Sequence, residues 1–159
     1  MSKEIKRNAW SRFCKKFNQD HQHRSINISL EKNGRNSVIK SRPFIGLAIS
    51  KKGRAISGLE LCSISTNPEK LCEPLAVIKD PESIKLIKDD NGFDARLVIE
   101  SKDGTRARVE LNGESNREAD IRQVAYSLFE RRGRTDGNDR QDWIEAERRL
   151  AALEQKFTQ

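Results

Sequence analysis

The segment from Glu114 to Gln159 constrains the fold most, because it carries the pattern of two helices joined by a short loop. Hydrophobic residues recur there at helical spacing in two runs, and a polar, Gly-rich segment separates the runs. The first run is Ile121, Val124, Ala125, Leu128 and Phe129, and the second is Trp143, Ala146, Leu150, Leu153 and Phe157. A connection this short makes the two helices antiparallel neighbours. The pattern therefore predicts an αα-hairpin over residues 115–157.

Polar residues and glycine predict where these two helices begin and end. Ser115 followed by Glu118 has the spacing of a capping box, which predicts that Ser115 is the first N-cap. Gly133 suits the left-handed residue that follows a helix, so the first helix should end near Arg132. Asp139 is the predicted cap of the second helix.

Several short runs in this hairpin keep the order and spacing of a known bacterial family. Residues 121–126, 129–133, 136–137 and 142–150 resemble the domain of unknown function 2934 (DUF2934). That family shows A-Y-x-x-x-x-x-R-G-x-x-x-G followed by D-W-x-x-A-E-x-x-L, and this chain differs in carrying Phe129 where the family tends to carry Trp. The resemblance implies a helical hairpin, and it implies no catalytic residues.

Residues 4–111 read as one helix followed by strands. Trp10, Phe13, Cys14 and Phe17 lie at i, i+3, i+4 and i+7, which predicts a helix with one apolar face. Residues 25–32 alternate between apolar and polar side chains and end at Asn33-Gly34, which predicts a half-buried strand and a tight turn. Further strands are expected at residues 38–40, 44–50 and 56–64, with a break at Arg42-Pro43 and a loop over residues 65–74.

The last strands before the hairpin form the clearest pairing. Residues 95–100 and 106–111 alternate on either side of Asp103-Gly104, and residues 83–88 precede them, so a three-stranded antiparallel meander is expected. A one-sided helix on a one-sided sheet makes two layers. The predicted class is α+β: an N-terminal helix packed on a mainly antiparallel sheet, followed by a C-terminal αα-hairpin.

A second resemblance covers residues 5–111. Trp10, Phe13, Phe17 and His21, the alternating strand that follows and the turn at residues 100–105 are similar to the bacterial domain of unknown function 5335. This family also implies no known activity.

The positive charge of the chain is concentrated at its N-terminus. Residues 1–54 contain fourteen Lys or Arg against three acidic residues, whereas the whole chain has a formal net charge of +7. The candidate anion-binding residues are Arg12, Lys15, Lys16, Arg35, Lys40, Arg42, Lys51, Lys52 and Arg54. Lys and Arg bind phosphate backbones through counterion release, so these residues predict contact with nucleic acid, nucleoprotein or another polyanion. A solvated basic surface without a ligand is the alternative.

A partner surface on the hairpin is the other hypothesis, in which the protein is a protein-protein adaptor or a stress-related accessory factor. Its candidate residues are Tyr126, Arg131, Arg132, Arg134 and Trp143. Packing between the hairpin helices also explains the two aromatic residues. The sequence predicts neither an oligomeric state nor the orientation of the hairpin on the sheet.

Catalytic and metal sites are not indicated. His21 and His23 lack the i, i+4 spacing of two ligands on one helix face, and we interpret them as residues that end the first helix. The three cysteines have no C-x-x-C spacing, and no Gly-rich phosphate loop is present. We therefore expect no enzymatic activity, cofactor or metal. No apolar run approaches the roughly 18 residues of a membrane span, so no membrane insertion and a cytoplasmic location are expected.

Overall fold

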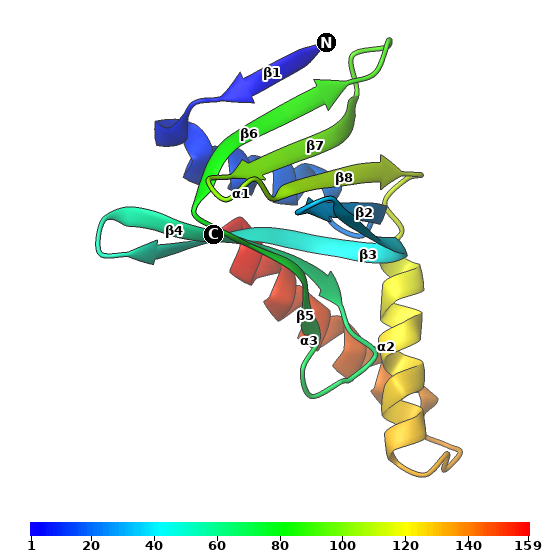
Figure 1. Ribbon diagram of the computed structural model, residues 1–159. Coiled ribbons are helices and arrows are strands. Elements are labelled where there is room, and N and C mark those ends of the chain that lie inside the picture. The colour runs from blue at the N-terminus through cyan, green and yellow to red at the C-terminus, as the bar shows by residue number, and fades with distance from the viewer.

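The computed structural model describes residues 1–159 and consists of an eight-stranded antiparallel sheet, an N-terminal helix and a C-terminal helix pair (Figure 1). The helices are the 3-10 turn η1 (Arg7–Ala9), α1 (Trp10–His21), α2 (Arg117–Arg131) and α3 (Asp139–Thr158). The strands are β1 (Ser2–Ile5), β2 (Ser25–Lys32), β3 (Arg35–Lys52), β4 (Ala55–Ile64), β5 (Cys72–Lys79), β6 (Pro81–Lys88), β7 (Asp94–Ser101) and β8 (Arg106–Asn112). Their order in the sheet is β1-β6-β7-β8-β2-β3-β4-β5. The predicted α+β class is confirmed, as is the β6–β7–β8 meander.

Strand β3 is long and connects the two halves of the sheet. The predicted break at Arg42-Pro43 was wrong, because the strand continues through it and exchanges one neighbour for another. Its first part pairs with β2 as far as Pro43, and its second part pairs with β4 from Phe44 onward. Ser41 has a φ of 56°, and its amide donates to Asn27 Oδ1 at 2.8 Å, so the chain bends without losing its hydrogen bonds. The sheet therefore changes direction at this point.

Helix α1 packs into the concave side of the bent sheet. Trp10 and Phe17 are almost completely buried, and the Phe17 ring meets the Phe44 ring edge-on at 5.6 Å. The same core includes Leu59 of β4 and Leu97 of β7, so both halves of the sheet contribute to it. The one-sided helix predicted from the sequence is confirmed, since its apolar face is the buried one.

The C-terminal hairpin packs on the opposite face of β3 and β4. Ile45 and Cys62 point away from α1 and join a second core with Val124 of α2 and Leu150 of α3. Adjacent residues of a strand point to opposite faces, so Phe44 and Ile45 belong to different cores. The central part of the sheet is thus covered on both faces.

Glycine at position 46 lets α3 approach β3 closely. A Cβ atom added to Gly46 would lie 2.3 Å from the Cγ and Cδ1 atoms of Phe157. Phe157 is 5% exposed and belongs to the second core. The last turn of α3 therefore packs against β3 in the space that a side chain at position 46 would occupy.

The hairpin begins differently from the prediction. The capping box at Ser115 was wrong, because Asn116 is the N-cap and its side chain accepts from the amide of Ala119. Ser115 instead donates to the backbone carbonyl of Gln22 at 2.8 Å, and so connects the hairpin to the first part of the chain. Asp139 is the first residue of α3 and Asn138 precedes it as the N-cap, which corrects the second predicted cap by one residue.

The predicted end of the first hairpin helix is confirmed. Helix α2 ends at Arg131, Arg132 is the C-cap, and Gly133 has a φ of 77°. Only glycine adopts this conformation without steric cost.

The two edge strands, β1 and β5, were not predicted. The expected loop over residues 65–74 is shorter, because β5 begins at Cys72. Pro74 lies in β5 at a register irregularity opposite Cys62. Proline is tolerated there because one side of an edge strand needs no hydrogen-bond donor.

Candidate functional site

His23 lies in the connection between α1 and β2, where the first part of the chain meets the hairpin. Its φ is 71°, a left-handed conformation that is uncommon for residues other than glycine. The backbone amide donates to the carbonyl of Phe44 at 2.7 Å, and the carbonyl accepts from the amide of Asn116 at 3.0 Å. These two bonds hold the residue between β3 and the start of α2.

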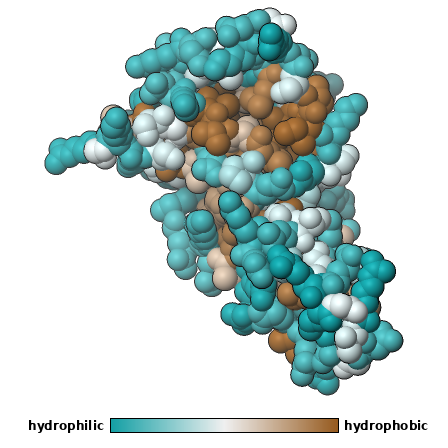
Figure 2. Space-filling view, turned by 60° about the horizontal axis from the view of Figure 1, so that its bottom comes forward, coloured by the Kyte–Doolittle hydropathy of each residue, from teal (hydrophilic) through white to brown (hydrophobic).

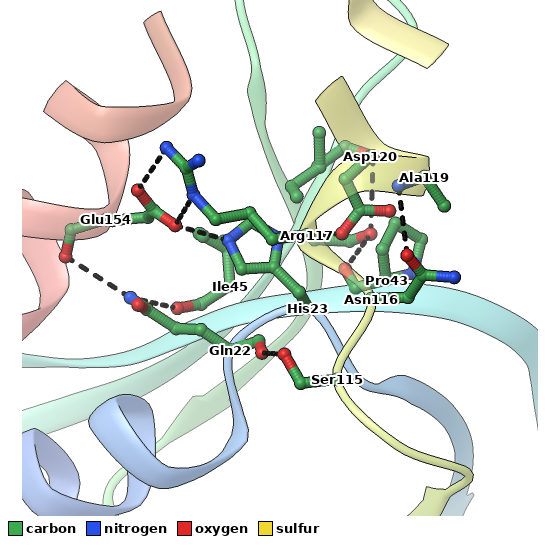
Figure 3. A network of polar contacts seen from close by, with 12 residues as sticks. Gln22, His23, Pro43, Ile45, Ser115, Asn116, Arg117, Ala119, Asp120 and Glu154 are labelled. Carbon is green, nitrogen blue, oxygen red and sulfur yellow. Dashed lines mark hydrogen bonds and ion pairs between the residues drawn. The ribbon is translucent and has the colours of Figure 1, made fainter. Parts of the chain in front are cut away.

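The imidazole of His23 is buried between two carboxylates from the hairpin (Figure 3). Nδ1 lies 2.7 Å from Asp120 Oδ2, and Nε2 lies 2.5 Å from Glu154 Oε2. Carboxylates only accept hydrogen bonds when ionised, so both ring nitrogens donate and the ring carries a positive charge. Burial disfavours that charge, but the hydrogen bonds and charges of Asp120 and Glu154 outweigh it and raise the pKa of His23 above its usual 6.5.

Arg117 extends this contact into a chain of alternating charges. Its Nε and one terminal nitrogen donate to the two oxygens of Glu154 at 2.7 and 3.2 Å (Figure 3). Burial opposes ionisation of Glu154, but Arg117 and His23 together lower the pKa of its carboxyl. We call Asp120, His23, Glu154 and Arg117 the junction network. It joins the α1–β2 connection to both helices of the hairpin.

Two amide side chains, Asn18 of α1 and Gln22 directly after it, complete the junction. Asn18 accepts from the amide of Leu47 at 2.8 Å, and donates to the carbonyls of Leu47 and Phe157 at 3.0 and 2.8 Å. Gln22 donates to the carbonyls of Ile45 and Glu154. Strand β2 pairs with β3 only as far as Pro43. Beyond that residue β4 pairs with one edge of β3, and the two amides satisfy backbone groups on the edge that β2 has left.

His21 occupies a separate polar cluster. Its Nε2 lies 2.8 Å from Asp94 Oδ2, and its Nδ1 lies 3.2 Å from a terminal nitrogen of Arg24. Arginine only donates, so Nδ1 accepts and Nε2 carries the proton. The interpretation of both histidines as residues at a helix end missed their burial and their carboxylate partners. Asp120 and Glu154 lie 97 and 131 residues from His23 along the chain, and no local sequence pattern reports such contacts.

Most of the predicted anion-binding residues are exposed and without an acidic partner. Lys16 pairs with Asp20 at 2.8 Å, and Arg42 pairs with Glu73. No ion pair involves the other seven, which are Arg12, Lys15, Arg35, Lys40, Lys51, Lys52 and Arg54.

Two of these residues, Lys15 and Arg35, line different hollows of the surface. Helix α1 packs along β3, and Lys15 lines a recess together with Ile49, two residues before Lys51. Arg35 lies elsewhere, in a groove of about 880 Å³ that also contains Lys32 and Lys79. The structure therefore brings the face of α1 close to the end of β3, and places Arg35 apart.

Most of the surface in view is hydrophilic, with one hydrophobic part (Figure 2). Figure 2 shows hydrophilic residues over the projecting β3–β4 turn, at the left, and over most of the C-terminal hairpin, at the lower right. Hydrophobic residues gather in a patch over the sheet.

The candidate partner-binding residues of the hairpin mostly contact other parts of the chain. Arg131 donates to Asn67 at 2.7 Å and to Glu69 at 3.3 Å. Arg132 pairs with Asp142, and Arg134 pairs with Glu130 at 3.3 Å. Trp143 is half-buried against the second core, and its Nε1 donates to Glu147 at 2.6 Å. Tyr126 is 53% exposed, and its ring centroid lies 6.0 Å from that of Phe129.

The hairpin matches a known family. The family described as Protein of unknown function (DUF2934) matches residues 116–152, which confirms the resemblance expected for this segment. The DUF2934 segment contributes Arg117 and Asp120 to the junction network, while Glu154 lies just beyond it. No curated protein and no solved structure matches the chain. The resemblance of residues 5–111 to the second family stays a prediction.

Two further features of the whole chain bear on function. No group of three or more His, Cys, Asp or Glu side chains is arranged to hold a metal ion. None of the helices combines the length and the apolar character that crossing a membrane requires.

Proposed function

We propose that this protein is a cytoplasmic, non-enzymatic nucleic-acid-binding protein that holds phosphate groups on the basic surface of α1 and β3. The observation that carries the proposal is the uncompensated charge of that surface. Seven of the nine candidate residues are exposed and make no ion pair within the chain; Lys15, Lys51 and Lys52 are among those on this surface, whereas Arg35 lies apart. Their positive charge is therefore available to an external anion.

The arrangement of these residues favours contact with the phosphate backbone of a nucleic acid over contact with its bases. Lys15 lies beside β3, and Lys51 follows Ile49 of the shared recess, so α1 and the β3–β4 turn can contact one extended ligand. Of the aromatic residues of α1, Trp10 and Phe17 are buried in the core, and Phe13 is half-buried and packs against it. This surface of α1 therefore presents no fully exposed aromatic ring on which a base could stack, and binding should depend little on the nucleotide sequence.

Titration of a labelled 20-nucleotide single strand at several salt concentrations tests this function. Raising salt from 50 to 200 mM should weaken binding about 100-fold, because each phosphate contact releases counterions. The variant Lys15→Gln/Lys51→Gln/Lys52→Gln should reduce the slope of log affinity against log salt by about 2.

A matched control removes the same charge elsewhere. Lys3, Lys85 and Lys102 make no ion pair and lie on β1, β6 and the β7–β8 turn. Their triple Gln variant should keep the wild-type slope. If wild-type protein binds no better at low salt than a basic control protein such as lysozyme, the proposal fails.

A protein-protein adaptor is the second candidate, and two exposed apolar side chains of the hairpin favour it. Tyr126 on α2 is 53% exposed and Ile144 on α3 is 57% exposed. Recovery of partners with tagged protein after nuclease treatment should then be lost in Tyr126→Ala/Ile144→Ala. Recovery that depends on nucleic acid and not on these residues would contradict it.

A further inference from the structure

Helix α3 carries basic residues on its outer side that the N-terminal charge surplus does not include. A groove of about 670 Å³ separates α3 from the β4–β5 loop, and Lys70, Arg148, Arg149 and Lys156 line it. Glu69 is the one acidic lining residue, and it pairs with Arg131 at 3.3 Å. The groove therefore has a positive charge although the chain around it is nearly neutral.

Part of this charge is compensated internally and part is not. Arg148 and Arg149 share the single carboxylate of Glu145, with contacts of 2.5 and 2.8 Å. Their hydrogen bonds lower the pKa of the Glu145 carboxyl to about 2, so this acid remains charged. Two guanidinium groups beside one carboxylate leave a surplus of one charge. Lys70 and Lys156 are exposed and make no ion pair.

Lys156 belongs to two hollows at once. It lines the groove beside the β4–β5 loop, and it also lines the recess that contains Lys15 of α1 and Ile49 of β3. The two hollows thus lie on either side of the C-terminal turns of α3. Arg149 and Lys156 are seven residues apart on the same helix, which separates them by about 10.5 Å along the axis.

We propose that the basic surface of α1 continues across α3 through Lys156 into this groove, and that the continuous track binds the phosphates of a single-stranded nucleic acid. This inference rests on the proposed function and names its ligand. A strand that contacts both hollows must cross the end of α3 and enter a recess on each side. A flexible single strand follows such a path, whereas duplex DNA is stiff over roughly 150 base pairs.

The residues that line the track also predict which part of the nucleic acid they contact. The aromatic residue in the recess is Phe157, which is buried, and the groove contains none. Contacts are therefore made to phosphates, and homopolymer and mixed-sequence strands should bind equally well.

The test removes the charge of Lys70 and Lys156, the two lysines of the α3 groove that make no ion pair. Lys70→Gln/Lys156→Gln should reduce the salt slope for a labelled 30-nucleotide single strand by about 1.4, since each single-strand phosphate contact contributes about 0.7. Affinity at 100 mM salt should fall about 10-fold. Lys3→Gln/Lys102→Gln removes the same charge away from the track and should behave as wild type. Circular dichroism of each variant checks that it is folded.

The outcomes separate this inference from the proposed function. A wild-type slope in Lys70→Gln/Lys156→Gln, together with a reduced slope in the Lys15, Lys51 and Lys52 variant, overturns the track and leaves the proposed function intact. Tighter binding of a 30-base-pair duplex than of the single strand overturns the assignment to single strands. Absence of salt-dependent binding in wild-type protein overturns both.

Discussion

The N-terminal third and the C-terminal hairpin are both rich in basic residues, but they use them differently. Of the fourteen Lys and Arg in residues 1–54, three form ion pairs, namely Lys16, Lys32 and Arg42. Of the nine in residues 117–159, seven do so, and the exceptions are Arg140 and Lys156. Charge in the first region is available to a ligand, whereas charge in the hairpin mainly connects the hairpin to itself and to the sheet.

The hairpin is nearly neutral, yet ion pairs hold it to the first region. Its acids are buried or half-buried where they contact the first region, as Asp120 and Glu154 are at His23. Most of its exposed pairs are local, such as Arg122 with Glu118, although Arg131 pairs with Glu69 of the β4–β5 loop. Local exposed pairs contribute about 0 to 1 kcal/mol, while a buried pair that loses one partner costs several. Substitutions in the two regions should therefore differ in their effect on stability.

His23→Asn should have the largest effect on the hairpin. Asparagine tolerates the left-handed conformation of position 23, so the change isolates the loss of the imidazole. Asp120 loses its buried partner, and Glu154 keeps only Arg117. We expect a loss of about 3 kcal/mol in the free energy of unfolding, measured by urea denaturation.

His21→Asn is the matched control, since His21 is also buried beside a carboxylate, Asp94, but away from the hairpin. Hydrogen exchange of α3 amides should accelerate in His23→Asn and not in His21→Asn. Equal acceleration in both would contradict a specific role of the junction network.

The junction network also predicts how stability depends on pH. The raised pKa of His23 adds stability that is complete below about pH 6.5 and is lost as pH rises through the folded-state value. The lowered pKa of Glu154 adds stability that is complete above about pH 4.5 and is lost as pH falls through its folded-state value. Protection of α3 amides should therefore be greatest between these limits. The decline on the alkaline side should disappear in His23→Asn.

Asn18→Asp should have the next largest effect, of about 2 kcal/mol. The carboxylate cannot donate, so the carbonyls of Leu47 and Phe157 lose their partner in a buried site. Thermal unfolding measures the loss. Gln19→Glu makes the same chemical change at the next, exposed position and should leave stability within about 0.5 kcal/mol of wild type.

Gly46→Ala should cost about 1.5 kcal/mol, because the new methyl group displaces Phe157 from β3. Gly58→Ala is the control, since a Cβ there meets its nearest atom at 3.5 Å, an ordinary contact. In a Phe157→Ala background the cost of Gly46→Ala should disappear. A cost that persists without the ring would show that Gly46 serves another purpose.

Arg134→Gln should have the smallest effect. Its partner Glu130 lies four residues earlier in the chain, and both side chains are exposed. Stability should change by less than about 0.5 kcal/mol, and binding of a single strand should be unchanged. A large change in either measurement would contradict the conclusion that exposed local pairs of the hairpin contribute little to stability or to binding.

Local patterns predicted the elements whose pairing partners are close in the sequence. The β6–β7–β8 meander, the one-sided helix α1 and the end of α2 at Gly133 depend on neighbouring residues, so alternation and turn chemistry were sufficient. The predicted capping box at Ser115 was wrong because the Ser115 hydroxyl donates to the carbonyl of Gln22, which is distant in the sequence. The predicted break in β3 failed for a similar reason, since β4 continues the pairing where β2 ends.

The candidate site was only partly predictable. The excess of Lys and Arg before residue 54 is visible in composition, but which of them lack an acidic partner depends on distant residues, as Arg42 and Glu73 illustrate. Lys70 and Lys156 lie outside the basic third and join the surface only because α3 packs beside the β4–β5 loop.

The sequence alone determined the helical hairpin, its family, the antiparallel meander and the concentration of charge, because these follow from periodicity and from residues near one another in the chain. Tertiary structure decided where the hairpin lies, how it is held through His23 and Asn18, and which basic residues remain free. The contacts of His23 with Asp120 and Glu154, and of Asn18 with Phe157, require residues more than 90 positions apart to meet. Only the packing of the two cores brings them together.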